Sequence, residues 1–290
     1  MAFRYVSTNL ALIHPRLLTT LILLDPVIQK NPSASSGSGP SPARASTIRR
    51  DLWPSRSAAA ESFRKSKFYQ AWDERVLDRW LQYGLRDLPT AIYPGDSTAE
   101  DVDSPVTLTT TKHQEVFTFL RANFNSKDEH GKEVINRLTH ADFDPATPRS
   151  FPFYRPEPVR TYHNLPFVRP SVLYIFGGSS WLSPPGSRKE KMELTGSGVG
   201  GSGGVKEGRV KEVVLENTGH LVAMEAVEAC ADATADWLRG ELERWREEED
   251  KFTQEWSTRT RRDKLVTSEE WKKLIDEGPS KDRPARKGKL

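Results

Sequence analysis

The stretch Thr19-Thr20-Leu21-Ile22-Leu23-Leu24-Asp25-Pro26 decides the fold class of this chain. Residues 21–24 are an unbroken apolar run, and the Asp-Pro pair that follows them is a turn signal. A short continuous apolar run is typical of a strand that is buried on both faces, as in a parallel sheet. Residues 7–14 have the pattern of a helix that Pro15 ends. We therefore expect a helix followed by a parallel strand.

Two more apolar runs predict further strands of the same sheet. The first, Val172-Leu173-Tyr174-Ile175-Phe176, ends in Gly177-Gly178, and the second spans residues 210–215. A helical pattern follows each of them, over residues 186–194 and 221–249. The order strand, helical insert, strand, helix, strand, helix predicts the α/β class with a parallel sheet. Residues 21–24, 172–176 and 213–215 should be neighbouring parallel strands.

The long insert between the first two strands is predicted to be mainly helical. Residues 57–72, 73–85 and 109–124 have helical patterns, with Asp73 as the N-cap of the second. Prolines between residues 127 and 170 indicate a loop-like segment. Residues 31–46 are rich in Ser, Pro, Gly and Ala, and residues 195–208 are rich in glycine, so we expect both to be disordered or exposed.

Composition excludes several classes of protein. The 43 basic and 40 acidic residues leave a net charge of +3, which gives no dominant positive field for nucleic-acid binding. The most apolar run, residues 17–28, is shorter than the roughly 20 residues of a membrane span. Cys230 is a single cysteine in an apolar-periodic run, so we expect a buried thiol, no disulfide framework and an intracellular compartment.

His220 is the strongest candidate for a chemical role. It follows Gly219 just past a predicted buried strand, at the carboxyl edge of the sheet, where parallel-sheet proteins place ligands. Imidazole titrates near neutral pH, as a general base must. The alternative is a histidine that merely caps a turn. Because no His, Cys, Asp or Glu cluster has metal-ligand spacing, neither a metal nor a cofactor is predicted.

Several segments resemble, in order and spacing, parts of the α/β-hydrolase family. Residues 10–18 and the strand after them resemble the segment that follows the nucleophile elbow, the sharp strand-to-helix turn that carries the nucleophile. Residues 170–178 resemble the penultimate core strand, and Asn217-Thr218-Gly219-His220-Leu221-Val222-Ala223-Met224-Glu225 resembles the turn that delivers the catalytic histidine. The runs 49–56 and 64–72 are similar to fungal toxin-biosynthesis hydrolases, which resemble peroxisomal lipase-like hydrolases.

The resemblance implies an α/β-hydrolase-like parallel sheet, incomplete at its N-terminus, with a helical cap insertion. Residues 1–30 would be the core helix and strand after the elbow, and residues 31–165 the cap insertion and loops. Residues 166–249 would be the C-terminal core with the histidine turn, and residues 250–290 a charged tail. The aromatic-rich helices of the insert would form an apolar pocket, with ordinary core packing as the equal alternative.

The implied chemistry is a Ser-His-Asp mechanism on an ester, thioester or lactone, with His220 as base. The loop after Phe176 has no carboxylate, so Asp25, at the end of the preceding strand, is the candidate acid. The other interpretation is that Asp25 only caps the turn before Pro26. The predicted partner is a small acyl or lactone-like molecule. If Asp25 serves His220, their side chains should lie within about 2.6–3.2 Å.

The nucleophile is the gap in this hypothesis. An elbow needs Gly-x-Ser-x-Gly between a strand and a helix, and its expected place lies just before Leu10. Ser7 has no flanking glycines, and Ser202 in Gly200-Gly201-Ser202-Gly203-Gly204 follows no apolar strand, so we reject both. We expect a truncated, inactive hydrolase, with a non-catalytic binding protein as the alternative. The C-terminal Gly288-Lys289-Leu290 resembles a Ser-Lys-Leu peroxisomal signal, or is a basic tail that ends in Leu.

Overall fold

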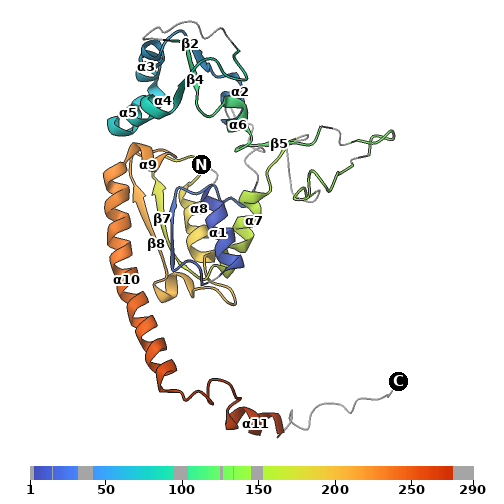
Figure 1. The fold of residues 1–290 in the computed structure, drawn as a ribbon, viewed down its shortest axis with the longest axis vertical. Helices are drawn as coiled ribbons and strands as arrows, with labels where there is room; N and C mark the ends of the chain where they lie inside the picture. The colour runs from blue at the N-terminus through green and yellow to red at the C-terminus, as the bar shows by residue number, and fades with distance from the viewer. Residues whose placement is uncertain are drawn as a thin grey trace. The chain divides into compact units, whose positions relative to one another are not determined.

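The computed structural model describes residues 3–14, 16–31, 42–94, 104–124, 127–132, 134–144 and 153–276. The chain divides into two compact units, Met1–Trp237 and Leu238–Leu290. The first unit contains a core sheet, its covering helices and the insertion that follows the first strand, and Figure 1 traces these elements along the chain.

The core sheet is parallel, as the apolar runs predict. Its described strands are β1 (Thr20–Leu24), β7 (Ser171–Gly177) and β8 (Val210–Leu215), in the order β1-β7-β8. Leu21 of β1 is opposite Val172 of β7, which in turn is opposite Val210 of β8. Every residue of β7 is buried, because this central strand is covered on both faces and paired on both edges. The prediction of three neighbouring parallel strands is confirmed.

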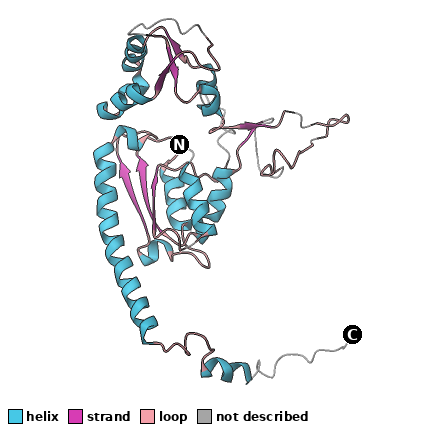
Figure 2. Ribbon diagram, in the orientation of Figure 1, coloured by secondary structure: helices cyan, strands magenta, loops and turns pink. Residues whose placement is uncertain are grey.

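Side chains of β7 alternate between two apolar layers. Val172, Tyr174 and Phe176 belong to a cluster with residues of α1 (Phe3–Ile13), α7 (Glu157–Asn164) and the short helix η2 (Leu165–Phe167). Leu173 and Ile175 belong to a second cluster with Cys230 and Trp237. Helices therefore cover both faces of the sheet, with α1, α7 and α8 (Pro185–Leu194) on one side and the first turns of α10 (Val227–Thr258) on the other (Figure 2).

The insertion that the resemblance assigns to the cap has its own small sheet and aromatic core. The antiparallel strand order is β2-β4-β3, formed by β2 (Leu52–Trp53), β4 (Val106–Leu108) and β3 (Leu85–Asp87). Its helices are α2 (Pro42–Ile48), α3 (Arg56–Lys65), α4 (Lys67–Gln70), α5 (Glu74–Tyr83) and α6 (Lys112–Val116). Trp53, Phe63 and Leu77 are buried among them. The predicted N-cap is confirmed, since the Asp73 side chain accepts a hydrogen bond from the Arg75 amide at 2.9 Å.

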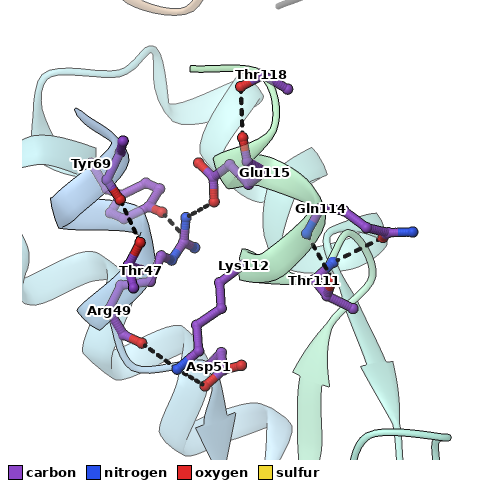
Figure 3. Close-up of polar contacts among 10 residues, drawn as sticks. Thr47, Arg49, Asp51, Tyr69, Thr111, Lys112, Gln114, Glu115 and Thr118 are labelled. Carbon is purple, nitrogen blue, oxygen red and sulfur yellow. Dashed lines mark hydrogen bonds and ion pairs between the residues drawn. The ribbon is translucent and has the colours of Figure 1, made fainter. Parts of the chain in front are cut away.

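Ion pairs join the segment just after α2 to the helix α6 of the insertion. The Arg49 guanidinium lies 2.8 Å from the Glu115 carboxylate, and the Lys112 ammonium lies 3.1 Å from Asp51 (Figure 3). Lys112 also donates to the Arg49 carbonyl at 3.3 Å. Thr111 caps α6, accepting from the Gln114 amide at 3.1 Å. These partly buried charges are mutually paired, as charges removed from water must be.

Some predicted helix boundaries of the insertion are wrong. The helix expected over residues 57–72 is interrupted at Ser66, which separates α3 from α4. Of residues 109–124, only Lys112–Val116 is helical, and β5 (Arg121–Ala122) pairs with β6 (Phe153–Tyr154). The segment 127–170, expected to be a loop, contains α7, which starts just after Pro156 and tolerates Pro158 in its first turn.

The glycine-rich segment 195–208 is largely exposed, as expected, but it is ordered and is not a linker. It packs onto the core, with Thr195 fully buried, and it contains the short helix η3 (Gly204–Glu207). A Cβ atom on Gly201 would lie 2.5 Å from the carbonyl oxygens of both Gly196 and Pro166. The glycines therefore allow a tight loop, not a linker.

The other segment expected to be disordered or exposed, residues 31–46, is described only in part. Positions 32–41 lie outside the described residues, and positions 42–46 belong to α2, where Ala43 and Ser46 are buried.

The C-terminal helical region is longer than predicted. One helical turn, α9 (Val222–Glu225), precedes α10, which continues to Thr258 instead of ending near residue 249. The exposed helix α11 (Glu269–Asp276) follows, and residues 277–290 lie outside the described part of the chain. Among the helices described here, none combines the length and the apolar character that crossing a bilayer requires.

Candidate active site

Asp25 is placed at the carboxyl edge of the sheet by the end of β1. Its amide donates to the Ile175 carbonyl of β7 at 2.8 Å, which extends the strand pairing by one residue. Its φ of +39° is in the left-handed region, which aspartate tolerates better than most residues. The side chain is fully buried. Backbone strain of this kind persists where the surrounding structure holds the residue in one conformation.

His220 reaches the same edge on the loop that follows β8. The loop lies against the end of β7, where the Ser179 amide donates to the Thr218 carbonyl at 3.0 Å. A Cβ atom on Gly177 would lie 2.0 Å from the Gly219 carbonyl oxygen, so only glycine fits there. Asn217, at the start of the loop, has a φ of +59°. Among the described residues, the non-glycine residues with positive φ are therefore Asp25 and Asn217, both beside this site.

The structure brings Asp25 and His220 together. The Nδ1 atom of His220 lies 2.7 Å from Oδ2 of Asp25, inside the range that the sequence hypothesis requires. The His220 side chain is 18% exposed, and that of Asp25 is 0% exposed. A buried carboxylate bound to Nδ1 can hold the tautomer that leaves Nε2 as the acceptor of a proton. The roles of base and acid themselves stay predictions.

The Asp25 carboxylate is kept ionised by its neighbours. Burial acts to raise the pKa of Asp25, but the hydrogen bonds from His220 and Ser180, the nearby Ser183 hydroxyl and the charge of a protonated His220 together lower it below 3.8. The Ser180 hydroxyl donates to Oδ2 at 2.6 Å. In the sequence, the loop after Phe176 stands out only for its missing carboxylate. No sequence signal indicates that a serine of this loop serves a carboxylate from another strand, as Ser180 does.

A second buried charge near Asp25 was also missed. Lys191 of α8 is fully buried, and its ammonium lies 5.5 Å from the centre of the Phe176 ring. Its Nζ atom has no hydrogen-bond partner among the described residues. Burial lowers the pKa of Lys191 to about 8, and the Asp25 charge opposes that shift. No pattern in the sequence distinguishes this lysine from the exposed Lys189 of the same helix.

The rejected Ser202 lies far from His220. The Ser202 amide donates to the carbonyl of Val168, which precedes β7, so Ser202 lies at the amino edge of the sheet. His220 is at the opposite edge, about 20 Å away along a strand of this length. Ser7 belongs to α1. Within the described residues, no hydroxyl or thiol group is hydrogen bonded to His220, and no three His, Cys, Asp or Glu side chains converge as a metal site needs.

Comparison with known proteins identifies the family of this chain. The protein named type I acyl-CoA thioesterase mpaH from Penicillium roqueforti is 41% identical, over 98% of this chain and 67% of its own length. The abhydrolase domain-containing protein AFT2-1 from Alternaria alternata is 30% identical, over 77% of this chain and 74% of its own length. The chain belongs to the α/β-hydrolase family.

The solved structures agree with this α/β-hydrolase fold. The peroxisomal alpha-beta-hydrolase Lpx1 from Saccharomyces cerevisiae superposes with a TM-score of 0.50 at 14% identity, over 94% of this chain and 57% of that chain. No family model matches the sequence. The α/β-hydrolase described here thus spans about two thirds of the mpaH relative and a little over half of the Lpx1 structure. The family resemblance and the parallel α/β fold predicted from the sequence are confirmed.

Proposed function

We propose that this α/β-hydrolase takes part in the hydrolysis of an acyl thioester or ester, with His220 as general base and Asp25 as its partner. The observation that carries the proposal is the 2.7 Å contact between His220 Nδ1 and Asp25 Oδ2. A thioester is preferred because the relatives with 40–41% identity are named acyl-CoA thioesterases. Lactones and oxygen esters stay alternatives, since they react through the same tetrahedral intermediate.

The chemistry follows from the orientation of the imidazole. With Nδ1–H donated to Asp25, Nε2 accepts the proton of an attacking serine hydroxyl as that oxygen bonds to the acyl carbon. The tetrahedral intermediate collapses, the carbon–sulfur bond breaks, and His220 returns the proton to the leaving thiolate. Water, activated by the same histidine, then hydrolyses the acyl-serine. The products are a carboxylic acid and a thiol, and Asp25 stabilises the imidazolium that forms in each half.

The serine is proposed to come from a segment outside the described residues. In the described sheet, β1 pairs with β7 on one edge only. A further parallel strand beside β1 would lie about 4.8 Å from it and would end at the same carboxyl edge as Asp25. A serine on the turn after that strand would be delivered to the exposed side of His220. Without such a strand and its serine turn, we expect no turnover.

The alternative is a non-catalytic binding protein with the same fold. It is favoured because, among the described residues, no hydroxyl group is hydrogen bonded to His220. A binding protein would retain an acyl-CoA without cleaving it, whatever segment is added to β1. A hydrolase would gain turnover. The two hypotheses therefore differ in one measurable property.

The test measures free thiol released from medium- and long-chain acyl-CoA. The 290-residue protein should equal its His220→Ala variant, and Ser202→Ala should change nothing. The same chain, extended before residue 1 by a strand and a Gly-x-Ser-x-Gly turn, should release thiol in a manner that His220→Ala and Asp25→Asn abolish. Thiol release by the unextended chain that Ser202→Ala removes would contradict the proposal. Tight acyl-CoA binding without release by the extended chain would favour the binding protein.

We also propose a peroxisomal location, which rests on the C-terminal Gly288-Lys289-Leu290. These residues lie outside the described part of the chain. A fluorescent protein fused to the N-terminus should co-localise with a peroxisomal marker, and removal of the last three residues should disperse it. An unchanged distribution would show that the tail is not an address.

A further inference from the structure

The carboxylate of Glu225 holds the peptide groups on both sides of His220. Its Oε2 atom accepts a hydrogen bond from the Gly219 amide at 2.6 Å. Its Oε1 atom accepts from the Leu221 amide at 3.1 Å. One side chain thus fixes the residue before the histidine and the residue after it. Hydrogen bonds to an ionised carboxylate are shorter and stronger than those between neutral groups.

The turn of α9 brings Glu225 back to this position. The amides of Met224 and Glu225 both donate to the Leu221 carbonyl, at 2.7 Å and 2.9 Å, so the chain folds back directly after the histidine. A Cβ atom on Gly219 would lie 2.9 Å and 3.1 Å from the two carboxylate oxygens of Glu225. Gly219 is therefore needed for the close approach of the carboxylate, and the glycine and the glutamate form one unit.

The opposite side of the loop is held by β7. The carbonyl groups of Thr218 and Gly219 lie within 2.0–2.6 Å of the place where a Cβ atom of Gly177 would be. The Ser179 amide donates to the Thr218 carbonyl at 3.0 Å. The histidine loop is thus confined between the end of β7 and the Glu225 carboxylate, and the backbone that carries the His220 side chain has little freedom to rotate.

We propose that Glu225 is a positioning residue for His220, which keeps Nδ1 within hydrogen-bond reach of Asp25. The proposal rests on the proposed function, because it assumes that the contact between His220 and Asp25 matters for the reaction. Among the described residues Glu225 is not hydrogen bonded to Asp25, and it would act through the backbone of residues 219–221. A hydrogen bond weakens steeply once its distance or angle departs from the optimum, so a small rotation of this backbone would release the imidazole.

The experiment uses NMR on the full 290-residue chain, so that it does not depend on turnover. Two quantities are measured: the exchange rates of the Gly219 and Leu221 amides, and the tautomer of the His220 ring from its nitrogen shifts. Glu225→Gln removes the charge at constant size and leaves one acceptor for two amides. Glu225→Asp keeps the charge but is one methylene shorter, so it serves if the glutamine variant does not fold. Glu228→Gln is the matched control, because this neighbouring glutamate side chain is 81% exposed.

In the wild-type chain we expect slow exchange of both amides and the Nδ1–H tautomer of His220. Asp25→Asn should abolish the preference for this tautomer. Glu225→Gln should speed the exchange of both amides at least about tenfold, as expected for hydrogen bonds to a charged group. It should also shift His220 toward the Nε2–H form that free histidine prefers. Glu225→Asp should keep at most one of the two amides protected. Glu228→Gln should leave both quantities at wild-type values.

Three outcomes would overturn the positioning role. Unchanged exchange in Glu225→Gln would show that the carboxylate does not hold the loop. Faster exchange with an unchanged tautomer would show that it braces the backbone without orienting His220. If the His220 tautomer is the same in Asp25→Asn as in the wild-type chain, both the proposed function and the positioning role are overturned. The pattern of results therefore tells the two failures apart.

Discussion

His220 and Asp25 are 195 positions apart in the chain, yet their side chains meet at 2.7 Å over the end of a strand to which neither belongs. Asp25 follows β1 and His220 follows β8, while β7 lies between these two strands in the sheet. The contact can form because β7 ends in Gly177 and is followed by Gly178, which place no side chain between the two loops.

The first prediction concerns this glycine end of β7. Gly177→Ala should push the histidine loop outward, because its Cβ would lie 2.0 Å from the Gly219 carbonyl oxygen. Overpacking of this kind costs about 1–3 kcal/mol in the free energy of unfolding, measured by urea titration. Gly186→Ala is the matched control, since no atom lies within 4 Å of its Cβ position. Equal stabilities of the two variants would contradict the packing described for the loop.

The second prediction concerns the contribution of Asp25 to the free energy of unfolding as the pH changes. Because its pKa is lower in the folded protein than in the unfolded chain, the ionised carboxylate contributes stability above about pH 4. This contribution is lost as the pH falls through the folded value. The difference in unfolding free energy between wild type and Asp25→Asn should therefore be largest near neutral pH and shrink toward about pH 2. A difference that stays constant over this range would show that the carboxylate is not favoured in its ionised form.

The third prediction concerns Lys191. The pKa of Lys191 falls from 10.5 to about 8 on folding. Burial of this lysine therefore lowers the free energy of unfolding at every pH at which the lysine is charged in the unfolded chain. Stability should rise between about pH 8 and pH 10.5 as the unfolded chain also loses this proton. Lys191→Met should raise the unfolding free energy by about 3 kcal/mol at pH 7, and the gain should disappear near pH 10.5.

The control for that prediction is Lys189, whose side chain is 76% exposed on the same helix. Lys189→Met should change stability by less than about 0.5 kcal/mol at either pH, as surface substitutions commonly do. If Lys191→Met destabilises the protein at pH 7, the buried ammonium must be stabilised by an interaction that outweighs the cost of burial.

The fourth prediction concerns the ion pairs of the insertion (Figure 3). Glu115→Gln removes the partner of a guanidinium whose side chain is only 23% exposed, at an observed distance of 2.8 Å. The loss should be about 1 kcal/mol, allowing for partial solvent screening. Asp78→Asn breaks the pair with Arg64, also 2.8 Å long, but both side chains are at least 50% exposed. Its effect should be close to zero in the same urea titration, and equal losses would show that burial does not set the strength of these pairs.

The tertiary structure decides which polar residues belong to the candidate site, and the sequence identifies only some of them. The glycine-histidine turn at Gly219-His220 could be recognised because a buried strand leads directly into it. Ser180 and Lys191 could not be recognised in the sequence, because a serine in a loop and a lysine in a helix usually face water. The run 195–208 is largely exposed, as expected, but glycine composition describes a linker and a tight loop equally well, so its ordered fold could not be predicted.

The sequence by itself determined the class of the fold, since a strand covered on both faces needs a continuous apolar run such as Leu21 to Leu24. It also placed His220 after a strand. It left two interpretations of Asp25 open, a partner of His220 or a cap of the turn before Pro26, because both predict an aspartate before a proline. Only the strand order β1-β7-β8 placed Asp25 beside His220. That order depends on contacts between segments far apart in the chain, and local patterns in the sequence do not encode such contacts.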